Sequence, residues 1–160
     1  MKVFTLNCGS SSIKYGVYSA EDCSLIASGL LEKIGSAESR LRQKRLTKEG
    51  SFDSLETSGQ VANHWEGFEF IMKANADDRI IKNDSELFGI GHRVVHGGEL
   101  FSKPTLIDDG VIAAIQKLIP LAPLHNPHNL LGIEVALKRS REVPQVAVFD
   151  TAFHQTLPPH

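Results

Sequence analysis

The sequence NCGSSSIK at residues 7–14 decides how the fold begins. An apolar run at residues 3–6 precedes it, and a second apolar run follows it. This layout predicts a strand, a tight glycine turn and a second strand. Because side chains alternate between the two faces of a strand, Ser10, Ser12 and Lys14 would share one face if the second strand begins that early.

A polar face that ends in a lysine, beside a flexible glycine turn, would suit a bound anion, and phosphate is the obvious candidate. The pattern is not a Walker A loop, which needs G-x-x-x-x-G-K-[ST] leading into a helix, because here the loop leads into a strand. Serine-rich turns are common, so an ordinary polar hairpin is the simpler interpretation of these eight residues alone.

Composition places the chain in a broad class. The 160 residues carry 17 Lys and Arg against 19 Asp and Glu, which lacks the basic excess expected of a nucleic-acid-binding protein. The two cysteines, Cys8 and Cys23, do not form a disulfide-rich pattern. We expect no signal peptide, and no apolar run in the sequence approaches the roughly 18 residues of a membrane span. We therefore expect a soluble, cytoplasmic protein with reduced thiols and no nucleic-acid or membrane partner.

Apolar patterning along the rest of the chain predicts an α/β layer fold with a mixed sheet flanked by helices. Residues 35–58 are rich in charge, and we expect an irregular loop there, with a short strand near residues 41–46 and a solvated basic face. The other predicted strands cover residues 2–7, 12–19, 24–32, 87–95 and 145–149.

Helices are predicted between these strands. Asp108 fits the N-cap of a helix that Pro120 stops, and Asn126 and Pro127 fit the N-cap and first turn of a helix that runs to about residue 139. Apolar residues at helical spacing within residues 60–75 are more typical of a core-facing helix than of a cofactor site. They are Val61, Trp65, Phe68 and Met72.

Polar residues interrupt the predicted strand within GHRVVHGGE, residues 91–99. On a strand, His92 and His96 would lie about 13 Å apart, which excludes one metal ion bound by both. Arg93 and Val95 would instead share a face, with a cationic fork for a carboxylate beside a small apolar wall. The alternative for Arg93 is a buried salt bridge.

Two further segments carry candidate residues. In PLHNPHN, residues 123–129, His125 could donate a hydrogen bond or a positive charge to a transferring phosphoryl group, although lone loop histidines are usually exposed or structural. Asp150 follows the last apolar strand, at the end where ligands bind in open α/β sheets. It is a candidate metal orienter or general base; the alternative is the cap of a turn or helix.

Taken together and in this order, the four motifs resemble the acetate kinase family, the acetate/propionate kinases that move phosphate between ATP and a short carboxylate. The resemblance covers essentially the whole chain. It implies the ribonuclease H-like fold of actin, sugar kinases and heat-shock chaperone ATPases, in agreement with the predicted element order.

The resemblance also implies a role for each candidate residue. Asp150 would be the catalytic aspartate, and we favour metal positioning over base catalysis for it, because a short carboxylic acid is already ionised at neutral pH. Mg²⁺ or Mn²⁺ would be the cofactor, with ATP as co-substrate. The other implied roles are acid binding by Arg93, an acyl pocket of Val95 and Leu124, phosphoryl stabilisation by His125, phosphate binding by Ser10, Ser12 and Lys14, and metal contact by Asn7.

Acetate kinases are two-domain proteins much longer than this chain. Residues 1–160 therefore fit a truncated N-terminal domain without the family's C-terminal nucleotide-binding domain and main dimer surface. We expect the parent protein to be a homodimer that makes acetyl phosphate and ADP, and this piece alone to have little or no activity. The alternatives are a propionate or butyrate kinase, or a non-catalytic binding module.

Overall fold

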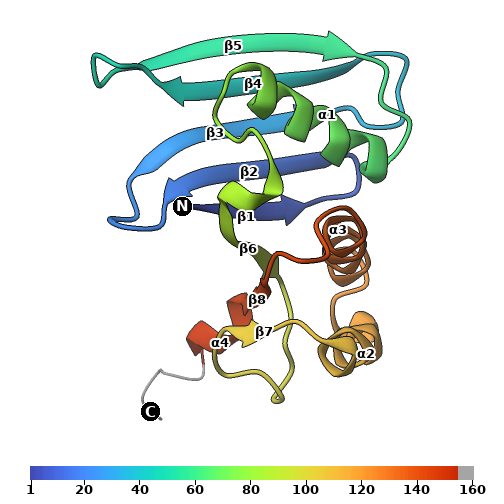
Figure 1. Cartoon of the computed structure of the whole chain (residues 1–160). Coiled ribbons are helices and arrows are strands. Elements are labelled where there is room, and N and C mark those ends of the chain that lie inside the picture. The colour runs from blue at the N-terminus through green and yellow to red at the C-terminus, as the bar shows by residue number, and fades with distance from the viewer. Residues whose placement is uncertain (155–160) are drawn as a thin grey trace.

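The computed structural model describes residues 1–154 and their side chains through Ala152, and these residues form an eight-stranded mixed sheet with helices packed against it (Figure 1). The strands lie in the order β5-β4-β3-β2-β1-β6-β8-β7. Their bounds are β1 Lys2–Cys8, β2 Ser12–Ser19, β3 Leu25–Glu32, β4 Ser39–Leu46, β5 Phe52–Gly59, β6 Leu87–Val94, β7 Thr105–Leu106 and β8 Gln145–Phe149. The helices are α1 His64–Asp77, α2 Asp109–Lys117, α3 Asn126–Arg139 and α4 Asp150–His154, with 3₁₀ turns η1 Asp84–Glu86 and η2 Ile119–Leu121.

Two kinds of strand pairing meet at β1. Strands β1 to β5 form an antiparallel meander, whereas β1 pairs in parallel with β6 and β6 pairs in parallel with β8. The short strand β7 closes the far edge in the antiparallel direction. The predicted mixed α/β sheet is therefore confirmed, and the carboxyl ends of β1, β6 and β8 lie at one edge.

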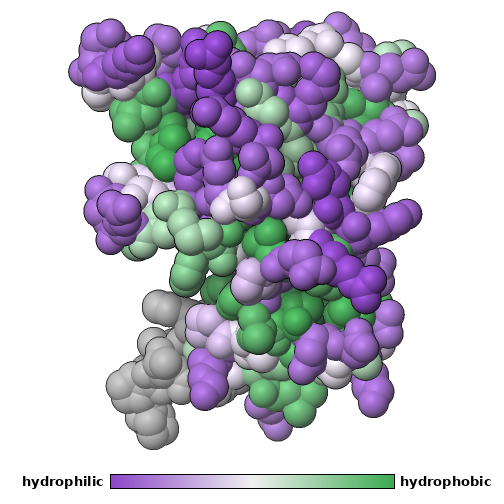
Figure 2. Space-filling model, viewed as in Figure 1, coloured by the Kyte–Doolittle hydropathy of each residue, from purple (hydrophilic) through white to green (hydrophobic). Residues whose placement is uncertain are grey.

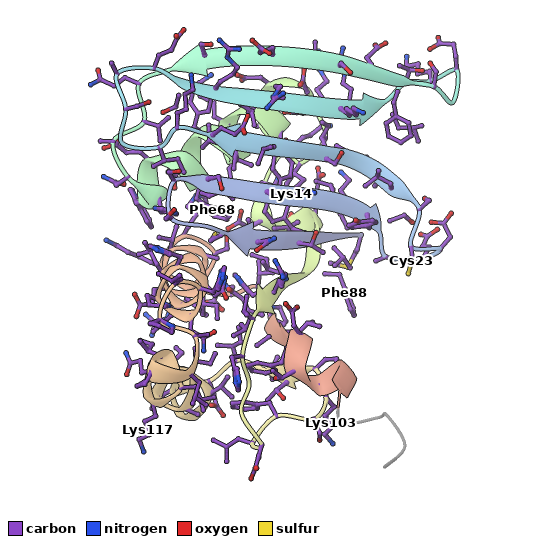
Figure 3. All side chains as sticks on the ribbon, turned by 180° about the vertical axis from the view of Figure 1, so that it is seen from behind. Lys14, Cys23, Phe68, Phe88, Lys103 and Lys117 are labelled. Carbon is purple, nitrogen blue, oxygen red and sulfur yellow. The ribbon has the colours of Figure 1, made fainter. Side chains whose placement is uncertain are left out.

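The alternation of side chains explains which face of the sheet is covered. Helices α1 and α3 pack over the face that carries the apolar residues of β1 and β2 (Figure 1). The opposite face carries polar side chains such as Asn7 and Lys14, and Figure 3 shows Lys14 on that uncovered face. The apolar residues that these two strands bury are Phe4, Leu6, Cys8, Ile13, Tyr15 and Val17.

A second, smaller core lies under the C-terminal half. There Val94 and Phe149, near the ends of β6 and β8, pack with Ile115 of α2 and Ile133 of α3. Figure 2 shows apolar side chains between the hydrophilic ones over this lower half, whereas hydrophilic side chains dominate over β4, β5 and α1. Among the described helices, none is both long and apolar enough to cross a membrane.

The short strand predicted near residues 41–46 is present within β4, but the rest of the charged segment after Gly35 is not the irregular loop that the sequence suggested. The segment forms the hairpin of β4 and β5, because β4 itself alternates and buries Leu41 and Gln43 on one face. The predicted solvated basic face is confirmed for Arg40 and Arg42, which are exposed and pair with glutamates on the neighbouring strands.

The helix signals were largely correct, with two differences at helix ends. Asp108 caps α2, since its carboxylate accepts from the Val111 N–H at 2.8 Å, but the helix ends at Lys117 and Pro120 lies within η2. For α3 the N-cap residue is His125, not Asn126. The Asn126 side chain is buried and bonds to the backbone of His96 instead of capping its own helix.

Gly132 determines how closely α3 approaches the end of β1. A Cβ atom at this position would lie 2.4 Å from the Cys8 sulfur. We expect Gly132→Ala to lower the free energy of unfolding by about 1–2 kcal/mol, because overpacking outweighs the better helix propensity of alanine. Urea unfolding of both proteins measures the difference.

The cause of this loss can be isolated with Cys8→Ala. Adding this change to Gly132→Ala removes the clashing sulfur, so the double variant should lose less than the sum of the two single changes. Strictly additive losses would contradict the proposed contact.

Candidate functional site

The site is built where the parallel strands end. The residues that follow β1, β6 and β8 are Gly9, Val95 and Asp150, and strand pairing brings all three ends to one edge of the sheet. In open α/β sheets this is the edge where ligands bind. Asp150 is the first residue after β8, so its predicted place at the carboxyl end of a buried strand is confirmed.

Arg93 and Asp150 form a two-point ion pair at this edge. The guanidinium of Arg93 donates from Nε at 3.1 Å to both carboxylate oxygens of Asp150, and from Nη2 to Oδ2 at 2.7 Å. The Arg93 side chain is 50% exposed and that of Asp150 is 39% exposed. The pair is therefore open to solvent and ligands, and the alternative of a buried salt bridge does not apply.

The glycine turn lies next to this pair. Gly9 N–H donates to the carbonyl of Ser12 at 2.9 Å, and the paired strand β2 begins only at Ser12. Ser12 and Lys14 therefore share a strand face as predicted, whereas Ser10 lies exposed in the turn itself. Lys14 sits directly opposite Asn7 in the β1–β2 ladder, so their side chains leave the sheet on the same face.

A groove on the uncovered face crosses β2, β1 and β6 and reaches Arg93. Its volume is about 340 Å³, and Asn7, Lys14 and Arg93 all line it, together with Val148 of β8. The absence of a side chain at Gly91, which also lines the groove, leaves this part of the sheet surface open. Three of the predicted site residues are thus brought together from three different strands.

Other predicted residues lie around the start of α3. Val95 is half-buried, but β6 ends at Val94, so the strand alternation that would put Val95 on the same face as Arg93 stops one residue short. His125 is exposed at the N-cap of α3, and the Leu124 side chain is 77% exposed. The predicted acyl-pocket role of Val95 and Leu124 and the phosphoryl role of His125 remain predictions.

Several polar residues that hold the site were not singled out from the sequence. Two asparagines of α3 bond to the backbone after β6: Asn129 to Val95 and Asn126 to His96. His64 of α1 lies with its Nε2 2.7 Å from the carbonyl of Gly9. The Thr151 hydroxyl accepts from Gly97 N–H at 2.9 Å. One available signal was the i, i+3 spacing of two asparagines inside a helix whose next residues are apolar.

Two titratable groups under the site are kept neutral by burial. Burial lowers the pKa of His92 to about 4, and Nε2 of this residue lies 2.8 Å from the side-chain oxygen of Gln145. Burial raises the pKa of the Cys8 thiol to about 12, so this cysteine next to the turn is a packing residue and not a nucleophile. His96 lies beyond the strand, where its Nδ1 accepts from Gly98 N–H.

Residues 2–160 match the Acetokinase family. The chain belongs to the Acetokinase family. It is 48% identical over 160 residues to the acetate kinase of Syntrophobacter fumaroxidans, a match that covers 99% of this chain and 39% of that enzyme. It is also 48% identical over 157 residues to the acetate kinase of Streptomyces avermitilis, with 98% of this chain and 38% of that protein covered.

Solved structures agree with the sequence comparison. A Porphyromonas gingivalis acetate kinase superposes with a TM-score of 0.86 at 43% identity, over 98% of this chain and 39% of that one. A Francisella tularensis propionate kinase also gives 0.86, at 36% identity over 98% of this chain and 38% of its own. These neighbours have the actin-like, ribonuclease H-like fold, so the predicted fold class is confirmed. The chain spans about two fifths of the length of the relatives it matches, and it corresponds to their N-terminal part.

The low pKa of His92 predicts a pH dependence of stability. Between pH 6.5 and 4 the unfolded chain binds a proton at His92 that the folded chain excludes, so the free energy of unfolding falls as the pH falls through this window. The effect approaches about 3 kcal/mol at the acid end. In His92→Gln the part of the fall in the free energy of unfolding that is due to His92 should be absent. Urea unfolding of both proteins at several pH values checks this, and two curves of equal slope against pH would contradict it.

Proposed function

We propose that the protein carrying this chain is an acetate kinase, which transfers the terminal phosphoryl group of ATP reversibly to acetate and yields acetyl phosphate and ADP. The observation that carries the proposal is the exposed pair of Arg93 and Asp150 beside the glycine turn, at the carboxyl edge of the parallel strands. Relatives named acetate kinase that match over nearly the whole chain support it.

Arg93 is suited to hold the acid. Asp150 takes the Nε–H and one Nη2–H of the guanidinium, which leaves the remaining N–H groups for a second carboxylate. A planar, permanently charged fork fixes the direction of a carboxylate as well as its position. Because the acid is already ionised at neutral pH, no base is needed, and Asp150 orients Arg93 and the reacting groups instead.

The turn is suited to hold phosphates. Phosphoryl transfer has a loose transition state with charge on its equatorial oxygens, so catalysis rests on alignment and on cationic stabilisation. In this proposal Ser10 and Ser12 donate hydrogen bonds to phosphate oxygens, and Lys14 adds a positive charge on the same open face. His125, exposed at the start of α3, stabilises the moving phosphoryl group.

The oxygen ligands at the site fit Mg²⁺ or Mn²⁺. Asn7 offers an amide oxygen in the groove, and Asp150 offers a half-exposed carboxylate at the same edge of the sheet. The described residues contain no cluster of three acidic, histidine or cysteine side chains that could hold a metal ion by itself. One or two protein oxygens plus substrate phosphates is the usual way in which Mg²⁺ is bound. When bound with ATP, the ion supplies charge neutralisation at the phosphates.

A second candidate is a kinase for a slightly longer acid, which the likeness to the Francisella propionate kinase favours. Val95 and Leu124 are the proposed walls of the acyl pocket. One methylene in such a pocket is worth only about 1–3 kcal/mol, so acetate and propionate would both be accepted at different rates. Family membership further supports a cytoplasmic homodimer without nucleic-acid or membrane partners as the parent protein.

Acyl phosphate formation tests the function. We expect the natural polypeptide that carries these residues to form acyl phosphate from Mg·ATP with acetate, and more slowly with propionate or butyrate. The 160 residues alone should be far less active, because they span only about two fifths of the length of the relatives named acetate kinase. Trapping the product with hydroxylamine measures the rates, and a lack of turnover with all three acids would contradict the proposal.

Arg93→Ala tests the acid site. We expect kcat/KM for acetate to fall by roughly 100-fold or more, because a charge-assisted fork is lost, while the KM for ATP changes little. Arg93→Lys should recover only part of the loss. Arg141→Ala, at an exposed arginine after α3, is the matched control. Equal acetate kinetics in Arg93→Ala and Arg141→Ala would reject this role for Arg93.

A further inference from the structure

The side chain of Asn129 joins the ends of two parallel strands. Its Nδ2 donates to the carbonyl of Cys8 at 3.0 Å, and its Oδ1 accepts from Val95 N–H, also at 3.0 Å. Asn129 is only 4% exposed; its bond to the Cys8 carbonyl is buried, and its bond to Val95 N–H is part-buried. One amide group on α3 therefore contacts the residue before the glycine turn and the first residue after β6.

These two bonds replace strand pairing that has already stopped. The β1–β6 ladder extends to the pair Leu6 and His92, and it does not include Cys8 or Val95. A primary amide presents a donor and an acceptor as a peptide group does, so Asn129 continues the connection across the gap. Without it, the buried Cys8 carbonyl and the part-buried Val95 N–H would lose these partners.

Neighbouring side chains fasten the same region. Asn126, fully buried and one helical turn earlier, accepts from His96 N–H at 3.1 Å and donates to the His96 carbonyl at 3.0 Å. His64 of α1, in the same helix layer, contacts the Gly9 carbonyl. The turn and the segment after β6 are thus both held by the helix layer, but Asn129 is the residue that bonds both to Cys8, just before the turn, and to Val95, just after β6.

We propose that Asn129 is a positioning residue that sets the separation between the phosphate turn and the acid-binding segment. The inference rests on the proposed function, in which the turn holds ATP phosphates and Arg93 and Val95 hold the acid. In-line transfer requires the two substrates at a defined distance, and a shift of about 1 Å can cost roughly 100-fold in rate. Asn129 acts through the backbone of Cys8 and Val95 and does not touch the reacting atoms.

Asn75 provides a matched control. It is also a fully buried asparagine in a helix, but its Nδ2 donates locally to the carbonyl of Ile71 in the same helix, α1. Asn75→Ala should therefore reproduce the general effect of removing a buried amide without changing the site. Asn129→Asp separates the two bonds, because aspartate keeps the acceptor for Val95 N–H and lacks the donor for the Cys8 carbonyl.

The kinetic test uses the natural polypeptide and compares wild type, Asn129→Ala and Asn75→Ala at a temperature where circular dichroism shows all three to be folded. In Asn129→Ala we expect kcat to fall by roughly 10- to 100-fold, with the KM for acetate and for ATP changed by less than about threefold. Asn75→Ala should keep the wild-type kcat. Equal kcat values in the two variants would overturn the proposal.

Amide hydrogen exchange supplies a readout that does not depend on turnover. In Asn129→Ala the exchange of both Gly9 and Val95 should accelerate by about tenfold or more, because both ends lose their tether. In Asn129→Asp only the Gly9 side should loosen. If the wild type makes no acyl phosphate, the proposed function is wrong, but hydrogen exchange still tests the role of Asn129. Unchanged protection of Gly9 or of Val95 in Asn129→Ala would overturn that role.

Discussion

Parallel pairing of β1 with β6, and of β6 with β8, is the constraint on which the candidate site depends. Parallel strands end at the same edge, so residues that are 57 positions apart, such as Arg93 and Asp150, come within hydrogen-bond distance there. Apolar side chains enforce the pairing, because Leu6, Ile90 and Phe149 must all face the helix layer. A slip of one residue would turn the polar groups of the groove into the core.

Buried polar side chains connect the helix layer to this edge. His64, Asn126 and Asn129 each contact backbone groups of the glycine turn or of the segment after β6. A buried polar group is costly without a partner, and these three have partners, which favours one arrangement of helix and strand ends over alternatives. The same bonds that make the helices fit the sheet therefore also determine the spacing of the site.

The Arg93–Asp150 pair, by contrast, contributes little to the stability of the fold. Half-exposed ion pairs contribute only about 0–1 kcal/mol to stability, since solvent screens them and side-chain order opposes them. Its two-point geometry instead restricts the orientation of the guanidinium toward the groove. Stability of this region thus comes from apolar packing and buried amides, whereas the exposed charges remain available for ligands.

Much of this was determined by the sequence itself. The apolar runs on either side of the glycine turn predicted the hairpin, and alternation put Ser12 and Lys14 on one face, because a strand has a two-residue period whatever it packs against. The apolar run before Asp150 likewise predicted an acid at a strand end, and four motifs in order identified the family. Charge in residues 39–59 hid the β4–β5 hairpin, since β-pairing depends on cross-strand partners that local composition does not reveal.

Only the tertiary structure decided what the helix α3 residues do. From the sequence, Asn126 was a helix cap and Asn129 had no assigned role, because an asparagine before a proline satisfies the local rule for a cap. Their partners, His96, Val95 and Cys8, lie 30 to 121 positions away along the chain. A local pattern can show that an amide is present, but the packing of α3 against β1 and β6 determines which backbone groups it meets.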